Sequence, residues 1–470
     1  MSDLDPATLS DAARLVRSGK CSSVDLTLAA LDRAENTQGR LNAFIEIDRA
    51  GALAAAEAAD RAVTEGRPLG PLHGVPLAHK DMYDHAGKIT GCGSKIRAGH
   101  IAGANASVVD RLHAAGTFSI GRLNMSEFAM GPTGHNHHHG RAINPIDSAR
   151  ITGGSSSGSG AAVGGGVVLA ALGSDTGGSI RLPAACCGVV GIKPTQGRVP
   201  RTGAMPLSFS QDCVGPLART VEDAFTILKT ISGPDGKDVS CVDVELAPLA
   251  SDISGIRVGL GGGMFLDGLT NEVAVAMEDT ITALRPHVKL ISDAALPDFG
   301  GIAELANVVA MSEAAAVHFD YMRERPDDYG PQLQSRLAQA LAVPAPIYLR
   351  ALQIRARMIE DFLRTAFIDC DAIIVPCMPF LPPLDTDVNV GAGPRMNEIL
   401  AGMTVFTRPF SFLGLPVVTL PVKNSNGLPV SIQVIARPWR EDIAVSIARK
   451  LETVLAVGRF HPLETIRPAA

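Results

Sequence analysis

The sequence predicts an α/β protein with one central mixed β-sheet that is covered by helices on both faces. Helical patterns alternate with short apolar runs of strand length along most of the 470 residues, and such alternation is typical of layered α/β folds. Neither an internal repeat nor a long low-complexity linker divides the sequence. We therefore expect a single domain over residues 1–470, with a helical N-terminal segment at 1–66 and a motif-rich core at 74–220.

The first half of the chain carries its expected elements in a regular order. Apolar residues recur at helical spacing after capping residues such as Ser10 and Ser23, and short apolar runs indicate strands. The segment 131–166 is rich in glycine, serine, histidine and proline and is expected to be a loop. Ser179 is expected to open a short helix that tolerates Pro183 in its first turn. We expect helices at 10–18, 23–36, 52–65 and 107–115, and strands at 75–78, 118–120, 166–172 and 189–192.

The second half continues the alternation with longer helices. Periodic apolar positions predict the helices, and short runs rich in valine, isoleucine and leucine predict the strands. We expect helices at 220–232, 271–285, 301–323, 347–367 and 441–454, and strands at 372–375, 417–420 and 431–435.

Composition and charge exclude several classes of protein. The net charge is −6 and no basic run could follow a phosphate backbone, so we expect no nucleic-acid partner. The N-terminus lacks a signal peptide, and the longest small-apolar stretch has 14 residues, whereas a membrane span needs about 20. We therefore expect a cytoplasmic protein with no membrane contact. Eight cysteines without a CxxC pair predict reduced thiols.

A serine that follows two glycines carries the first chemical signal. Gly177 and Gly178 allow the backbone before Ser179 to curl without Cβ clashes, so that successive N–H groups from Thr176 onward can point at one spot. A hydroxyl becomes an effective nucleophile only when a base takes its proton and donors hold the developing oxyanion. The segment fits a nucleophilic serine with an oxyanion hole, or a strand-to-helix turn with a capping serine.

A second serine cluster lies at 155–157. The residues around Ser156 match the pattern G-x-S-x-G of α/β-hydrolases. That motif requires a strand directly before it, and residues 149–153 are polar and typical of a loop. No Gly-Lys-Ser/Thr follows, so the segment is not a phosphate-binding P-loop either. The cluster is a flexible loop, or a set of hydroxyls placed to relay a proton.

Lys80 ends the apolar run that begins at Val75. Burial disfavours the ammonium form and lowers the pKa of a lysine, which can then act as a base near neutral pH. An isolated lysine of this kind more often lies at the surface. Its occurrence together with the two serine segments favours the base.

Taken together, these segments resemble the amidase signature family over most of the chain. The resemblance is densest from Gly153 to Gly215, and it continues at 414–416 and 427–429. It implies the amidase signature fold, with 74–220 as the catalytic core. It also implies hydrolysis of a small carboxylic amide through an acyl-enzyme, without a cofactor or a metal.

The resemblance assigns roles to individual residues. Ser179 corresponds to the nucleophile, Ser155 to the serine that follows a cis peptide, and Lys80 to the base; the serine spacing, 179 − 155 = 24, agrees with the family. The other implied roles are oxyanion donors at Thr176, Gly177, Gly178 and Ser179, a supporting ion pair of Asp175 with Arg181, and a hydrogen-bonding neighbour at Ser156.

Two further segments are expected near the mouth of the site. Phe128 and Met130 lie in a stretch that resembles the family's pocket-lining segment. His135 and His139 are four residues apart, but they lie in an expected loop without a paired carboxylate. We therefore expect no metal there.

The family contains two kinds of enzyme that this chain could represent. The glutamine-hydrolysing A subunits of glutamyl-tRNA amidotransferases hold glutamine with an arginine and an aspartate, and the resemblance places Arg355 at the arginine position and Thr404 at the aspartate position. A threonine cannot pair with an α-ammonium. We therefore expect a stand-alone amidase acting on a small neutral amide, with a homodimer as a candidate assembly. The alternative is the glutamine-hydrolysing A subunit.

Overall fold

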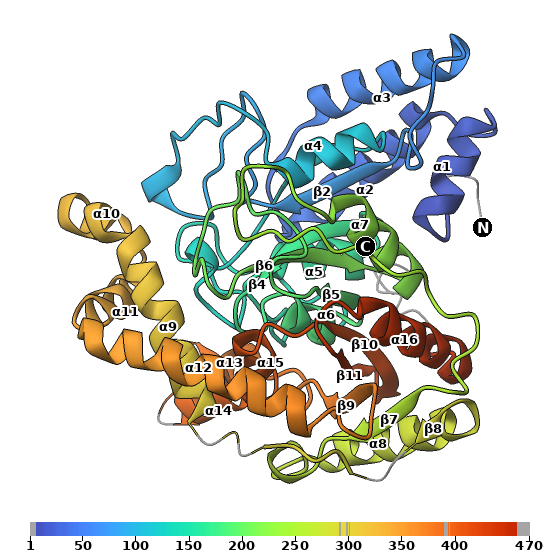
Figure 1. Cartoon of the computed structure of the whole chain (residues 1–470). Coiled ribbons are helices and arrows are strands. Elements are labelled where there is room, and N and C mark those ends of the chain that lie inside the picture. Colours follow the sequence, from blue (N-terminus) through green and yellow to red (C-terminus); the bar gives the residue numbers. More distant parts are fainter. Residues whose placement is uncertain are drawn as a thin grey trace.

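The computed structural model describes residues 6–290, 293–297, 299, 301–389, 393 and 395–457. Its centre is an eleven-stranded sheet in the order β1-β3-β2-β4-β6-β5-β10-β11-β9-β7-β8. β2 runs parallel to β3 and β4, whereas β4, β6, β5, β10, β11 and β9 pair in antiparallel fashion. The sheet is therefore mixed, and helices cover both of its faces (Figure 1). This confirms the predicted fold class.

The strands are short in the N-terminal half and longest in the C-terminal hairpin of β10 and β11. Their bounds are β1 Phe44–Ile47, β2 Pro76–Lys80, β3 Phe118–Leu123, β4 Ala170–Asp175, β5 Val190–Lys193, β6 Cys213–Ala218, β7 Arg257–Leu260, β8 Lys289–Leu290, β9 Ala372–Pro376, β10 Val417–Ser425 and β11 Leu428–Ala436.

Helices fill the connections between these strands. Their bounds are α1 Leu9–Arg17, α2 Ser23–Leu41, α3 Arg49–Thr64, α4 Ser107–Ala114, α5 Ser157–Gly164, α6 Arg181–Cys187, α7 Val221–Ile231, α8 Asn271–Leu284, α9 Ile302–Val317, α10 Phe319–Glu324, α11 Pro331–Leu341, α12 Ala345–Thr365, α13 Asp385–Val388, α14 Arg395–Val405, α15 Arg408–Phe412 and α16 Glu441–Leu455.

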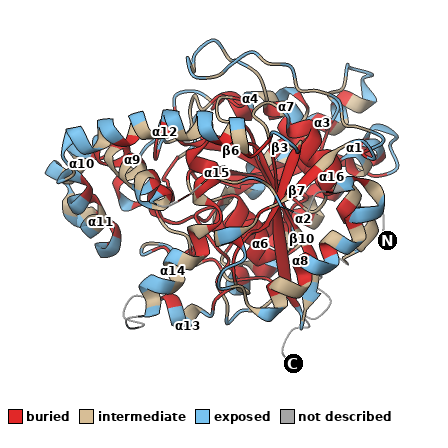
Figure 2. Cartoon of the chain, turned by 60° about the horizontal axis from the view of Figure 1, so that its bottom comes forward, coloured by how far each residue is buried: buried red, intermediate tan, exposed pale blue. Residues whose placement is uncertain are grey.

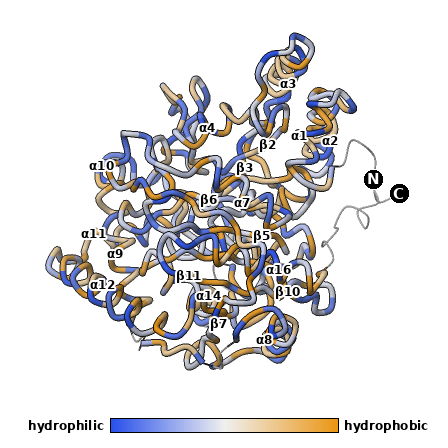
Figure 3. The backbone as a smooth tube through the Cα atoms, turned by 45° about the vertical axis from the view of Figure 1, so that its right-hand side comes forward, coloured by the Kyte–Doolittle hydropathy of each residue, from blue (hydrophilic) through white to orange (hydrophobic). Residues whose placement is uncertain are grey.

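The core lies along the sheet, and the helices turn their apolar sides to it. β2, β4, β6, β9 and β11 are buried along their whole length, and Figure 2 shows the sheet as a buried centre with exposed outer faces on α10, α11 and α12. Hydrophilic and hydrophobic residues alternate along outer helices such as α3 and α8 (Figure 3), as expected for helices with one packed face. None of the helices in the described ranges is both long and apolar enough to cross a membrane.

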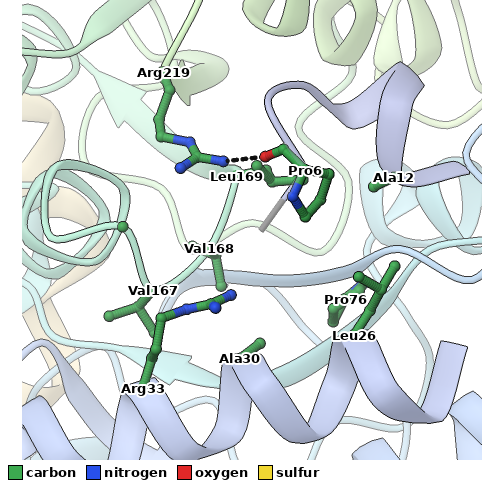
Figure 4. A pocket seen from close by; sticks show the side chains of 11 residues that line it. Pro6, Ala12, Leu26, Ala30, Arg33, Pro76, Val167, Val168, Leu169 and Arg219 are labelled. Atoms are coloured by element: carbon green, nitrogen blue, oxygen red, sulfur yellow. Dashed lines mark hydrogen bonds between the residues drawn. The ribbon is translucent and has the colours of Figure 1, made fainter. Parts of the chain in front are cut away.

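The N-terminal helix α2 packs beside the start of β2, which lies inside the sheet between β3 and β4. Leu26 and Ala30 of α2 face Pro76 and Val168 across a narrow gap of about 20 Å³, and the Arg219 guanidinium donates to the Pro6 carbonyl at 2.9 Å (Figure 4). The gap contains no residue of the serine and lysine motifs. The gap lies where the N-terminal segment packs on the core.

The expected elements differ from the structure mainly where glycine is frequent. Residues 157–164, expected to be loop, form α5, which is buried and packs on α6 and β4. Burial of this face outweighs the weak helix propensity of glycine and serine. The strand expected at 166–172 is β4, shifted to Ala170–Asp175. β6 was not expected because it contains Gly215 and Pro216; a Cβ at Gly215 would lie 2.1 Å from the Ile192 carbonyl oxygen, so glycine is required there. Further elements that were not expected are β1, β7, β8, α11, α13, α14 and α15.

A buried ion pair should fix the C-terminal helix to the core. The Arg198 guanidinium lies 2.8 Å from the Glu441 carboxylate, both side chains are 1% exposed, and Glu441 also accepts the Thr195 N–H at 2.9 Å. Glu441→Ala leaves a buried guanidinium without a counter-charge and should lower the free energy of unfolding by about 3–5 kcal/mol, measured by urea denaturation.

The matched control removes an exposed pair instead. Lys423 and Asp279 lie 2.5 Å apart with side chains 32% and 52% exposed, so Asp279→Ala should cost less than about 1 kcal/mol. If the chain is a single domain, the Glu441 variant shifts one transition as a whole. Equal losses in the two variants would contradict the role given to the buried pair.

Candidate active site

Lys80 is the last residue of β2 and lies fully inside the protein. Its Nζ lies 2.8 Å from the Ser155 Oγ and 2.8 Å from the Ser174 Oγ, with all three residues buried. Burial lowers the pKa of Lys80 from 10.5 to about 7, although the Asp212 and Asp175 carboxylates oppose the shift. A large fraction of this side chain is therefore a neutral amine at pH 7, which is the form that can accept a proton.

Ser155 and Ser156 form the turn that enters α5. The peptide bond between Gly154 and Ser155 is cis, as the family resemblance implied. The Ser156 Oγ accepts the Ser174 N–H at 3.3 Å and lies 3.3 Å from the Ser174 carbonyl oxygen, so it fixes the residue whose hydroxyl contacts Lys80. The Ser156 N–H donates to the Ser179 carbonyl at 3.2 Å. The two serine segments are thus joined directly.

Ser179 lies in the turn between β4 and α6. The turn is held by the buried ion pair of Asp175 with Arg181, whose charged atoms lie 2.9 Å apart with both side chains 0% exposed. Burial by itself would raise the pKa of Asp175, but the Arg181 charge and its hydrogen bonds outweigh burial and hold the pKa at about 2. α6 begins at Arg181, so Ser179 precedes the helix and does not open it as expected.

The backbone donors of this turn differ from the expectation at Gly178. Its N–H donates to the Asp175 Oδ1 at 2.9 Å, so it is already engaged and does not point freely at a substrate. Its φ is +136°, and a Cβ there would lie 2.5 Å from the Thr407 Oγ1, which explains the glycine. The N–H groups of Thr176, Gly177 and Ser179 have no protein acceptor within the described ranges.

A cavity of about 90 Å³ opens in front of this turn. It is lined by Ser179, Thr176 and Gly177 on one side and by residues of α9, α11, α14 and α15 on the other. Met130 lies in its wall, where the sequence placed it. The arrangement presents a serine, unpaired backbone donors and, behind them, a buried lysine to one small volume.

Two residues expected in the pocket have structural roles instead. The Phe128 ring packs edge-on against His318 at 4.4 Å, at the junction with α9, and is absent from the cavity wall. Arg355 of α12 donates to the carbonyls of Phe412 and Ser210 at 2.5 and 2.8 Å. These hydrogen bonds hold α12 against the core. Neither residue therefore lines the cavity beside Ser179, because adjacency in sequence and motif position do not specify side-chain direction.

The histidine loop makes separate contacts. His135 lies 2.8 Å from the Asp385 carboxylate, and His138 lies 2.9 Å from the Glu127 carboxylate. Across the described residues, no three metal-ligating side chains converge. The loop therefore joins the strand-rich core to α13, and His139 contributes its carbonyl to a hydrogen bond from Asn42.

Sequence reasoning missed several residues of this region. Ser174 was missed although it lies only five residues before Ser179, because only the pairing of β2 with β4 brings it to Lys80. Asp212 accepts a hydrogen bond from the Thr176 hydroxyl at 2.5 Å. It was missed because it directly precedes β6, a strand that was not expected. Arg336 and Arg408 line the cavity, and no motif signalled either of them.

Comparisons with known proteins identify the family of this chain. The profile of the Amidase family matches residues 25–444. The chain is 38% identical over 445 residues to AtzE, the 1-carboxybiuret hydrolase subunit of Pseudomonas sp. (strain ADP), covering 93% of this chain and 96% of that protein. It is 36% identical over 470 residues to the A subunit of the glutamyl-tRNA(Gln) amidotransferase of Chloroflexus aurantiacus, covering 94% and 95%.

Solved structures show the same fold. The peptide amidase of Stenotrophomonas maltophilia superposes with a TM-score of 0.83 at 28% identity, covering 96% of this chain and 98% of that one. The family match covers nearly the whole chain, and relatives above 30% identity cover it as well, so the family can be assigned. This chain belongs to the amidase family of amide-hydrolysing enzymes.

Proposed function

We propose that this enzyme hydrolyses a small carboxylic amide through an acyl-enzyme on Ser179, with Ser155 as the proton relay and Lys80 as the base. The observation that carries the proposal is the buried contact of 2.8 Å between the Lys80 Nζ and the Ser155 Oγ. The hydrogen bond from the Ser156 N–H to the Ser179 carbonyl holds the nucleophile's segment beside that pair.

The reaction proceeds in two balanced halves. As the Ser179 Oγ attacks the carbonyl carbon, its proton passes to Ser155, and the Ser155 proton passes to the neutral amine of Lys80. The carbonyl π electrons become an oxyanion, which the N–H groups of Thr176, Gly177 and Ser179 stabilise. Collapse of the oxyanion breaks the C–N bond, and the proton returns through Ser155 to the leaving nitrogen.

The second half repeats these transfers with water. Water attacks the ester carbonyl, one of its protons passes along the same relay to the leaving Ser179 Oγ, and the carboxylic acid is released and gives its remaining proton to the solvent. Ser174 gives the Lys80 amine its second hydroxyl partner at 2.8 Å. That contact keeps the amine oriented while its other positions exchange protons with Ser155.

We infer that the enzyme works as a stand-alone hydrolase and does not supply ammonia to a tRNA-bound partner. Thr404 lines the cavity, and its hydroxyl lies 3.4 and 3.3 Å from the carbonyls of Leu400 and Ala401 in its own helix. It offers no negative charge to an α-ammonium. We therefore expect a small amide as the substrate. We further propose that the enzyme acts in the cytoplasm without a nucleic-acid or membrane partner, and that a homodimer is the assembly to test.

The nucleophile assignment can be tested by labelling. Ser179→Ala should lower kcat by about 10³-fold or more, because the other hydroxyl of that turn, on Thr176, is already bonded to the Asp212 carboxylate. Labelling with a fluorophosphonate followed by peptide mass mapping should place the adduct on Ser179. An adduct on Ser156, which is fully buried behind the turn, would contradict the proposal.

The base assignment predicts a pH dependence. Only neutral Lys80 can accept the proton, so kcat/KM should fall about tenfold per pH unit below the pKa of about 7 and level off above it. Lys80→Ala should lose about 10²–10⁴-fold in kcat/KM and lose this acid limb. Lys88 is exposed and paired with Asp48, so Lys88→Ala should keep both. An acid limb that persists in Lys80→Ala would rule out Lys80 as the base.

The stand-alone function predicts a poor response to glutamine. Without an acidic partner for the α-ammonium, kcat/KM for glutamine should be about tenfold or more below that for glutarate monoamide, which differs only by lacking the ammonium. Thr404→Asp should narrow that difference. A preference of the wild-type chain for glutamine, or activity that appears only when tRNA and further subunits are added, would favour the alternative of a glutamine-hydrolysing amidotransferase component.

A further inference from the structure

Two arginines from different elements line the wall of the cavity that contains Ser179. Arg336 belongs to α11 and Arg408 begins α15, and both reach the same volume of about 90 Å³. They are close enough that the charge of Arg336 acts on Arg408. Neither residue takes part in the proposed proton relay.

Arg408 is placed against the nucleophile's turn without a counter-ion. A Cβ built at Gly177 would lie 3.6 Å from the Arg408 Cγ, so the stem of the arginine packs beside the oxyanion donors. Within the described part of the chain, its guanidinium makes no hydrogen bond or ion pair of its own. Burial and the Arg336 charge lower its pKa, and Glu304, exposed on α9, opposes them from beyond ion-pair distance.

Arg336 is nearly as poorly compensated. It donates one hydrogen bond, to the Met130 carbonyl at 3.3 Å, and burial lowers its pKa. The described residues of the cavity wall include no aspartate or glutamate. By contrast, the buried guanidinium of Arg181 has the Asp175 carboxylate at 2.9 Å. The cavity therefore holds two positive charges and no negative one.

An arginine cannot relieve such a position by losing its proton, because a guanidinium stays protonated in proteins at neutral pH. Two partly desolvated guanidiniums in one small cavity repel each other unless an anion binds between them. A planar guanidinium matches a carboxylate with two parallel hydrogen bonds.

We propose that Arg336 and Arg408 bind a carboxylate carried by the substrate itself, so that the enzyme acts on amides of short dicarboxylic acids whose second acid group is free. This inference rests on the proposed function, since Ser179 must attack the amide end of the same molecule. It replaces the expected neutral amide by an amide that also carries a free carboxylate.

The test compares amides that differ only in the charge at the far end. Succinate monoamide and glutarate monoamide each carry a carboxylate where the corresponding diamides carry a carboxamide of nearly the same shape. The wild-type protein should prefer each monoamide by tenfold or more in kcat/KM, beyond the statistical factor of two that favours a diamide. Most of the preference should lie in KM.

Charge removal at the two arginines should erase that preference. Arg408→Gln and Arg336→Gln should each lower the monoamide-to-diamide ratio by about 10- to 100-fold. Arg357 lies exposed on α12 and is absent from the cavity wall, so Arg357→Gln is the matched control and should keep the ratio. Equal losses on monoamide and diamide would show that the arginines act on the oxyanion, which overturns the proposal.

A second readout does not require turnover. Glutarate should slow the labelling of Ser179 by a neutral fluorophosphonate in the wild type and in Arg357→Gln, but not in Arg408→Gln. Labelling of each variant without glutarate shows that its site is folded. Protection by phosphate and not by glutarate, or equal kcat/KM for monoamide and diamide, would overturn the carboxylate assignment. Absence of both labelling and amide hydrolysis in the wild type would instead refute the proposed function.

Discussion

The buried ion pair between Asp175 and Arg181 joins the two halves of this protein at the turn that presents Ser179. The Asp175 carboxylate accepts the N–H groups of Gly178 and Ile180 as well as the Arg181 side chain. Arg181 in turn donates to the Thr407 carbonyl and to Gln433 in β11. A pair that is fully desolvated is stable only when its remaining hydrogen-bonding positions are filled, and here they are filled by the elements that surround the turn.

The other buried cations obey the same physics with different outcomes. Lys80 faces neutral hydroxyls, and it responds to burial by a pKa that falls to about 7. A buried ammonium can lose its proton in this way, and the resulting neutral amine can act as a base. A guanidinium cannot, so Arg408 beside the nucleophile's turn keeps its charge, and our proposal gives it a substrate carboxylate as partner. The paired Arg181, the largely neutral Lys80 and the unpaired Arg408 thus lie around one turn, and we propose support, proton transfer and substrate binding as their respective roles.

Glycine allows these groups to approach one another closely. At Gly178 the backbone adopts φ +136° and leaves room for Thr407, and at Gly215 it leaves room for the Ile192 carbonyl. The same residues made the local structure hard to predict, since glycine weakens both helix and strand patterns. The glycine-rich helix α5 and strand β6 are two of the core elements that periodicity missed, because burial against neighbours stabilises them and propensity does not.

The sequence by itself determined the alternation of helices and strands, the mixed sheet, and the serine and lysine motifs, because these depend on local periodicity and on short spacings. The family resemblance also implied the Asp175–Arg181 pair, whose members are six residues apart in the sequence. Only the tertiary structure decided which side chains meet across long separations. Ser174 contacts Lys80 because β2 pairs with β4. Arg355 donates its hydrogen bonds to the core. Arg336 and Arg408 line the cavity from α11 and α15. Side-chain direction and desolvation depend on packing between distant elements, and no local pattern encodes them.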